Sequence, residues 1–153
     1  MNTQLSKNFS FLEMTITENR KFLSQNRQAP EKLVESGVQL CQTLLQPIRD
    51  HYGKPLVVHS GYRCPALNKA IGGSVTSQHC KFEACDFHII ETPLTEIFDW
   101  IRLKSNLKWG QLILEGWSMG HPSWIHISLG EPYREPSKCQ QVMTFDGKKY
   151  QSI

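Results

Sequence analysis

Three residues in the middle of the chain have the types and spacing needed to bind a catalytic metal ion. His79 precedes Asp86 by seven positions, and His126 follows later. Imidazole and carboxylate groups are zinc ligands, and three protein ligands leave the fourth tetrahedral position for a water molecule. The pKa of such a water is lowered toward about 7. The pattern therefore predicts a site that binds Zn²⁺ and performs hydrolysis.

The chain between His79 and Asp86 has to fold back if both side chains are to bind one ion. Fully extended, this segment would separate the two Cα atoms by roughly 23 Å. We expect a loop after His79 that leads into a strand at 84–90 and aims Asp86 back toward it. A neighbouring antiparallel strand would then supply His126.

His88 is an alternative third ligand, because strand alternation places it on the same face as Asp86. We favour His126 because it lies in a strand of its own. We expect His51 and His59 to be surface or core histidines with no ligand role.

A water activated by a metal also needs a base that takes its proton and returns it to the leaving amine. The candidate is Glu115, a carboxylate at the end of a predicted strand. Arg63 is the candidate for holding a substrate carboxylate or developing negative charge, since its planar guanidinium offers paired donors. Ser77 and Gln78, just before the first histidine, are candidates for hydrogen bonds to the substrate or to the ligands.

Hydrophobic periodicity indicates the elements that must position these residues. A helical stripe with spacings of three and four opens at Pro30 and continues to Ile48, with a bend near Pro47. Period-two patterns predict four short strands, and further signals predict two shorter helices and a hairpin near the C-terminus. The strands are expected at 56–60, 84–90, 111–115 and 124–129, the helices at 65–70 and from 94 to 101, and the hairpin at 145–150.

Length and charge limit the class of protein. A chain of 153 residues that is 39% hydrophobic is long enough for one domain with a core, and we expect a single domain over 1–153. The net charge of +3 is scattered, which argues against a nucleic-acid partner. The sequence has no apolar N-terminal signal region and no run long enough to span a membrane. We expect a soluble protein that begins in the cytoplasm.

The five cysteines form a poor disulfide framework, because their number is odd and their spacing irregular. Cys80 and Cys85 flank the histidine motif and are conceivable metal ligands. Their spacing is not that of a usual zinc knuckle, and no second pair exists. We expect core or loop thiols.

Short motifs follow one another along the chain in a recognisable order. They are FSFLEM at 9–14, LLQPIR at 44–49, SGYRCPALN at 60–68, IGG at 71–73, SQH at 77–79, ACD at 84–86, QLILE at 111–115 and WIHIS at 124–128. In this order they resemble peptidase family M15, the zinc D-Ala-D-Ala carboxypeptidases and endopeptidases, and especially its phage and prophage-type branch. The resemblance covers most of the chain.

The resemblance implies a zinc ion bound by His79, Asp86 and His126, a glutamate as general base, and an arginine that contacts the substrate. It implies a compact α+β fold in which helices flank a small antiparallel sheet. It also implies cleavage of peptide bonds involving D-amino acids in peptidoglycan stems. The expected partner is therefore peptidoglycan or a cell-wall peptide, bound by a monomer. A phage lysin released to the cell wall through a separate membrane pore, or a cytoplasmic dipeptidase, fits these expectations.

Two positions depart from the family's pattern. Phe82 stands where the signature has glycine, which tolerates backbone angles that phenylalanine resists, so a rebuilt loop is expected. Some members carry the acidic residue where this chain has Ser123, whereas the most similar branch has it at the position of Glu115. Glu83 is a weaker candidate than Glu115 for the general base. A loop at 116–123 then lies at the expected rim of the site. These departures favour one rival function, a non-catalytic zinc-binding module such as a phage structural or cell-wall-binding protein.

Overall fold

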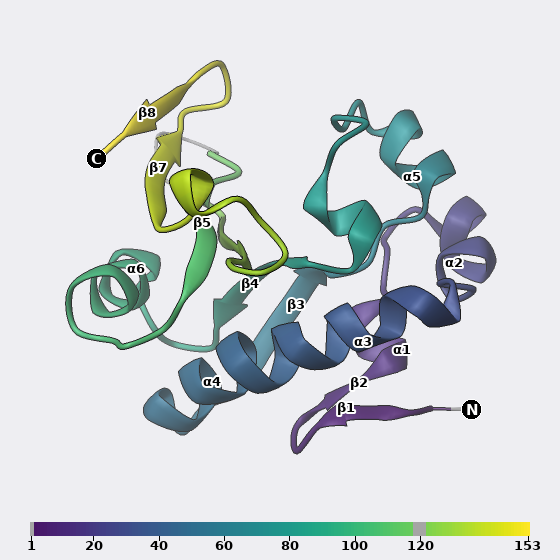
Figure 1. Cartoon of the computed structure of the whole chain (residues 1–153), viewed down its shortest axis with the longest axis horizontal. Helices are drawn as coiled ribbons and strands as arrows, with labels where there is room; N and C mark the ends of the chain where they lie inside the picture. The colour runs from purple at the N-terminus through teal and green to yellow at the C-terminus, as the bar shows by residue number, and fades with distance from the viewer. Residues whose placement is uncertain (1, 118–121) are drawn as a thin grey trace.

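The computed structural model describes residues 2–117 and 122–153, which form an α+β fold with a main sheet and a small N-terminal sheet (Figure 1). The helical elements are α1 (Phe11–Met14), α2 (Arg20–Asn26), α3 (Glu31–Leu40), η1 (Cys41–Leu45), α4 (Gln46–Tyr52), α5 (Pro65–Ala70), η2 (Gln78–Lys81), α6 (Leu94–Leu103) and η3 (Pro136–Lys138). The strands are β1 (Gln4–Ser6), β2 (Phe9–Ser10), β3 (Leu56–Ser60), β4 (Ala84–Ile89), β5 (Trp109–Glu115), β6 (Trp124–Leu129), β7 (Gln141–Phe145) and β8 (Tyr150–Ser152). The predicted strands, short helices and C-terminal hairpin are thereby confirmed.

The main sheet has six strands in the order β3-β4-β6-β5-β7-β8. Adjacent strands in this sheet are antiparallel, except for β5 and β7, which run parallel to each other. The prediction of a small antiparallel sheet is wrong for this mixed sheet, although β1 and β2 do form a small antiparallel one. The cause is topological: both edges of β6 are occupied by β4 and β5, so the strand that reverses direction after β6 pairs with the free edge of β5.

One long helix covers the core side of the sheet (Figure 1). Elements α3, η1 and α4 follow one another without a break from Glu31 to Tyr52, with a π-helical turn at Cys41–Leu45. The Gln46 amide donates to the Cys41 carbonyl, five residues back. The turn lies just before Pro47, which has no amide hydrogen and whose ring would clash with the carbonyl four residues earlier in a regular α-helix. The bend predicted near Pro47 therefore takes the form of this π turn.

The long helix and the sheet share a buried core. Its fully buried members include Leu40, Leu44 and Ile48 from the helix and Phe87, Ile125 and Ile127 from the sheet. Each such side chain contributes about 1.5–3 kcal/mol when it is removed from water. Alternation along β4 puts Cys85 and Phe87 into this core and turns Asp86 to the opposite face. The polar side chains of the candidate site therefore project from the face away from the long helix.

Candidate metal centre

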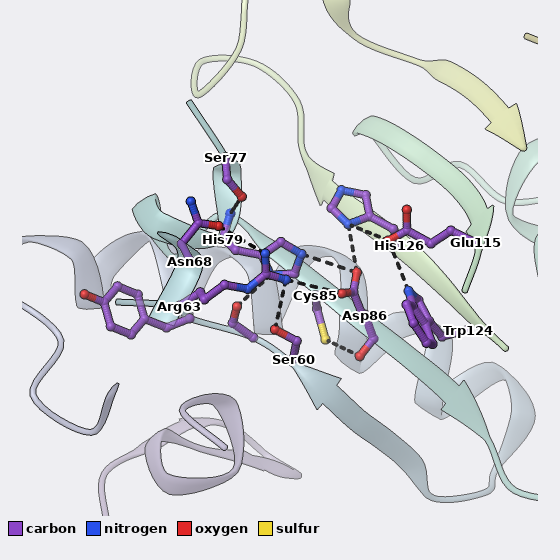
Figure 2. Close-up of polar contacts among 12 residues, drawn as sticks. Ser60, Arg63, Asn68, Ser77, His79, Cys85, Asp86, Glu115, Trp124 and His126 are labelled. Atoms are coloured by element: carbon purple, nitrogen blue, oxygen red, sulfur yellow. Dashed lines mark hydrogen bonds and ion pairs between the residues drawn. The ribbon is translucent and has the colours of Figure 1, made fainter. Parts of the chain in front are cut away.

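Three side chains from three different elements point toward one another on this face (Figure 2). His79 comes from η2, Asp86 from β4 and His126 from β6, and all three are buried. Their possible ligand atoms lie within 4.8 Å of one another. Asp86 Oδ1 is 3.3 Å from His79 Nε2 and 2.8 Å from His126 Nδ1. The structure thus brings together the three residues that the spacing singled out.

Strand register positions two of these residues and a tight turn positions the third. Asp86 and His126 are direct partners in the antiparallel β4–β6 ladder, so their side chains share one face. His79 lies in the turn η2, where the Ser77 hydroxyl accepts a hydrogen bond from the His79 amide at 3.3 Å. The chain then reverses at Phe82 and enters β4 two residues later. The predicted doubling back between His79 and Asp86 is therefore confirmed.

Phe82 adopts the left-handed backbone conformation at this reversal, with φ of 61°. A residue other than glycine pays about 1–2 kcal/mol for this conformation. Its side chain is fully buried and stacks on Tyr62 with ring centroids 5.4 Å apart, and a Cβ at Gly37 would overlap the ring. Burial of the ring offsets the backbone cost. Phenylalanine therefore supports the same sharp reversal that a glycine would, and His79 and Asp86 still meet.

The hydrogen bonding of His79 suits metal ligation. Its Nδ1 donates to the Gly61 carbonyl at 2.7 Å, so Nε2 is the ring nitrogen that faces Asp86 and is available to a metal. Histidines that bind metals commonly donate their other ring nitrogen to such an acceptor, which fixes the tautomer. Two imidazole nitrogens and a carboxylate converge in the same buried place, and these donors fit a divalent ion such as zinc.

The electrostatics favour a charged carboxylate at the centre. Burial raises the pKa of Asp86, but the charges and hydrogen bonds of His79 and His126 outweigh burial and hold that pKa well below its usual range. Burial lowers the pKa of His126, while its contact with Asp86 and the charge of Glu115 raise that pKa above the ordinary histidine value. Asp86 is therefore ionised at neutral pH, which is the form that binds a cation.

Glu115 lies beside the three residues at the end of β5 (Figure 2). Its Oε1 is 3.8 Å from His126 Nδ1 and accepts a hydrogen bond from the Trp124 indole at 3.0 Å. Burial and the charge of Asp86 raise the pKa of Glu115, and together they outweigh His126 and Trp124, which lower it. A carboxylate whose pKa is shifted toward neutrality can both accept and return a proton.

Arg63 contacts the centre from the side of β3. Its Nη2 lies 3.7 Å from Asp86 Oδ2 and 3.3 Å from the Ser60 hydroxyl, and its Nη1 donates to Asn68 at 3.2 Å. Its backbone amide donates to the carbonyl of His79. Arg63 also lines two neighbouring hollows of the surface, one with His79, Glu115 and His126 and the other with Asp86 and Trp124. A substrate that lies along these hollows would therefore pass Arg63.

Several other candidates take no part in the cluster. His88 Nδ1 lies 2.6 Å from His59 Nε2, a pair outside the group of possible ligands. Cys85 is a core thiol, and Glu83 accepts a hydrogen bond from Gln78. Ser77 is bonded to the His79 backbone. Residues 118–121 of the loop predicted at the rim lie outside the described residues.

Two residues of the site were not assigned from the sequence. Trp124 holds Glu115, and its position two residues before His126 on the same strand face was a usable signal. Arg134 lines the same hollow as His79 and Glu115. It follows the last motif of the sequence, so no pattern pointed to it.

The buried cluster with an adjacent carboxylate is the arrangement of a single-metal hydrolase centre. A protein-family model described as Peptidase M15 matches residues 7–128, which include every residue of the cluster as well as Glu115 and Arg63. The chain therefore belongs to peptidase family M15, as its ordered motifs predicted. No curated protein matches the chain. Within the described residues, no helix is long and apolar enough to cross a membrane.

Proposed function

We propose that this protein is a zinc-dependent peptidase that hydrolyses peptide bonds in the stem peptides of bacterial peptidoglycan. It would act as a D-Ala-D-Ala carboxypeptidase or as an endolysin-type endopeptidase. The observation that carries the proposal is the convergence of His79, Asp86 and His126 beside Glu115, in a chain that belongs to family M15.

Each residue of the site has its own role in the proposed reaction. His79, Asp86 and His126 would hold the zinc ion, which when bound polarises a substrate carbonyl and lowers the pKa of water. Glu115 is the general base, which accepts a proton from the attacking water and returns it to the leaving amine. The Trp124 indole keeps the Glu115 carboxylate in place. Arg63 contacts the substrate and also balances the charge of Asp86.

The proposal is tested with purified peptidoglycan and the protein loaded with zinc. We expect the wild-type protein to release peptide fragments, and mass spectrometry of these fragments identifies the bond. Glu115→Gln should keep its zinc and lose activity by about 100-fold or more, because it removes the proton acceptor. Glu96→Gln, an exposed change on α6, is the matched control and should keep full activity. A zinc-loaded wild-type protein that releases nothing from any cell-wall substrate would instead favour a non-catalytic zinc-binding module.

A further inference from the structure

A second arginine lines the hollow that contains the candidate centre. Arg134 lies between β6 and β7 and shares this hollow with His79, Glu115 and His126. The match to the family ends at residue 128, so Arg134 comes from a part of the chain beyond the match. The proposed reaction gives this arginine no role.

The guanidinium of Arg134 contacts neutral partners. Its Nη1 donates to Gln78 Oε1 at 2.8 Å, and its Nη2 donates to Gln141 Oε1 at 3.2 Å. Its Nε is buried and donates to no group within 2–117 or 122–153. Among these same residues, no carboxylate oxygen lies within 4 Å of it. Arg134 therefore forms no ion pair in the described part of the chain, although Glu83, on the other side of Gln78, is close enough for the charge of Arg134 to offset part of the rise in the Glu83 pKa that burial causes.

The surroundings hold this guanidinium in place. Gln78 Nε2 donates to Glu83 Oε2 at 3.2 Å and to the Leu129 carbonyl at 3.3 Å, which leaves its Oε1 for Arg134. Gln141 Oε1 also accepts from Gln111 at 3.2 Å. The aliphatic part of the Arg134 side chain packs against Gly110, where an added Cβ would lie only 3.0 Å from Arg134 Cδ. A donor group fixed in this way loses little freedom when a ligand binds.

Arg63 is less suited to donate to a second carboxylate, since its Nη2 already faces Asp86 Oδ2 at 3.7 Å. The Arg134 guanidinium has five N–H groups, and the two bonds that hold it go to neutral amide oxygens. A carboxylate can bind at the remaining N–H groups while these two bonds are kept, and charge-assisted hydrogen bonds are stronger than neutral ones. We propose that Arg134 forms a carboxylate-binding subsite in the cleft and gives the enzyme a preference for peptides with a free carboxylate near the cleaved bond. This assignment rests on the proposed peptidase function.

A stem peptide has two such carboxylates, one at its terminal D-Ala and one at the α-position of D-Glu. Amidating each in turn shows which of the two is bound. The probe is the pentapeptide L-Ala-γ-D-Glu-L-Lys-D-Ala-D-Ala, compared with one form amidated at the terminal D-Ala and another amidated at the α-carboxylate of D-Glu. We would measure kcat/KM for each peptide with zinc-loaded protein. The dissociation constants would be measured separately in a Glu115→Gln background. The variants are Arg134→Gln and Arg134→Lys, and the matched control is Arg102→Gln, which removes an arginine paired with Asp99 on α6.

In the wild-type protein, amidation at one of the two positions should reduce kcat/KM and weaken binding by about tenfold. Arg134→Gln should abolish this difference mainly through KM, Arg134→Lys should keep part of it, and Arg102→Gln should keep all of it. Zinc content and thermal unfolding show whether each variant is folded.

The proposal is overturned if neither amidation matters in the wild-type protein, or if the difference persists in folded Arg134→Gln. Carboxylate-dependent binding without hydrolysis would overturn the proposed peptidase function and still support the subsite.

Discussion

Asp86 is the residue on which the candidate centre most depends, because its carboxylate contacts His79, His126 and Arg63. Its depressed pKa follows from these contacts, which outweigh the effect of its burial. The sequence alone could predict this residue, since the motif spacing and strand parity both involve Asp86. It could not show that Arg63 contacts the same carboxylate, because that contact depends on how the chain after β3 packs against η2.

The choice between His126 and His88 can be tested by metal content. His126→Ala should lower zinc from about one ion per chain to nearly none, because one of three ligands is lost. His88→Ala should keep the ion, since His88 is bonded to His59 away from the cluster. Atomic emission analysis of dialysed protein measures both variants. Zinc lost from His88→Ala and kept by His126→Ala would reverse the assignment.

At the scale of elements, the turn from η2 into β4 shows how tertiary packing decides a local conformation. Propensity disfavours phenylalanine at a positive φ, and for that reason the sequence predicted a rebuilt loop. The ring of Phe82 instead fills the space beside Gly37 and Tyr62, and the reversal is retained. Gly37, whose missing side chain leaves room for this ring, lies on α3 and is far from Phe82 in the sequence. No local pattern could therefore reveal this contact.

Two substitutions at Phe82 should give an unusual order of stability. Phe82→Ala should cost about 3–5 kcal/mol of unfolding free energy through lost packing. Phe82→Gly should cost about 1 kcal/mol less than Phe82→Ala, because glycine tolerates the positive φ. Phe87 is equally buried but lies within β4. There Phe87→Ala should cost about 0.5–1 kcal/mol less unfolding free energy than Phe87→Gly. Urea unfolding at constant zinc measures all four variants, and the same order at both positions would contradict the backbone explanation.

At the scale of the whole molecule, the part of the chain from the long helix to β6 was more predictable than its two ends, and no pattern indicated β1, β2, α1 or α2. The stripe of the long helix and the alternation in β4, β5 and β6 are strong periodic signals, and they place the cluster on one sheet face. The mixed sheet was not predictable, because it depends on which sheet edge remains free for β7. Arg134 was missed for a related reason, since it enters the cleft only through this C-terminal path.

Metal binding should stabilise the entire fold, because the three ligands come from η2, β4 and β6. A free zinc concentration of about 100 times the dissociation constant adds about 2.7 kcal/mol. For a domain of this size that corresponds to about 5–10 °C in Tm. Calorimetry with zinc and after chelation measures the difference. His126→Ala serves as the control and should show almost no response to the chelator; an equal response in both proteins would place the stabilising ion elsewhere.

The direct pairing of Asp86 with His126 links strand alignment to ion binding. If β6 slipped by one residue against β4, Ile125 or Ile127 would stand opposite Asp86 and His126 would turn toward the core. Such a misaligned sheet would lose an ion ligand and bury an imidazole at the same time. An ion that binds during folding would therefore stabilise only chains in which β4 and β6 have paired in the native register, and it would favour that register over misaligned ones.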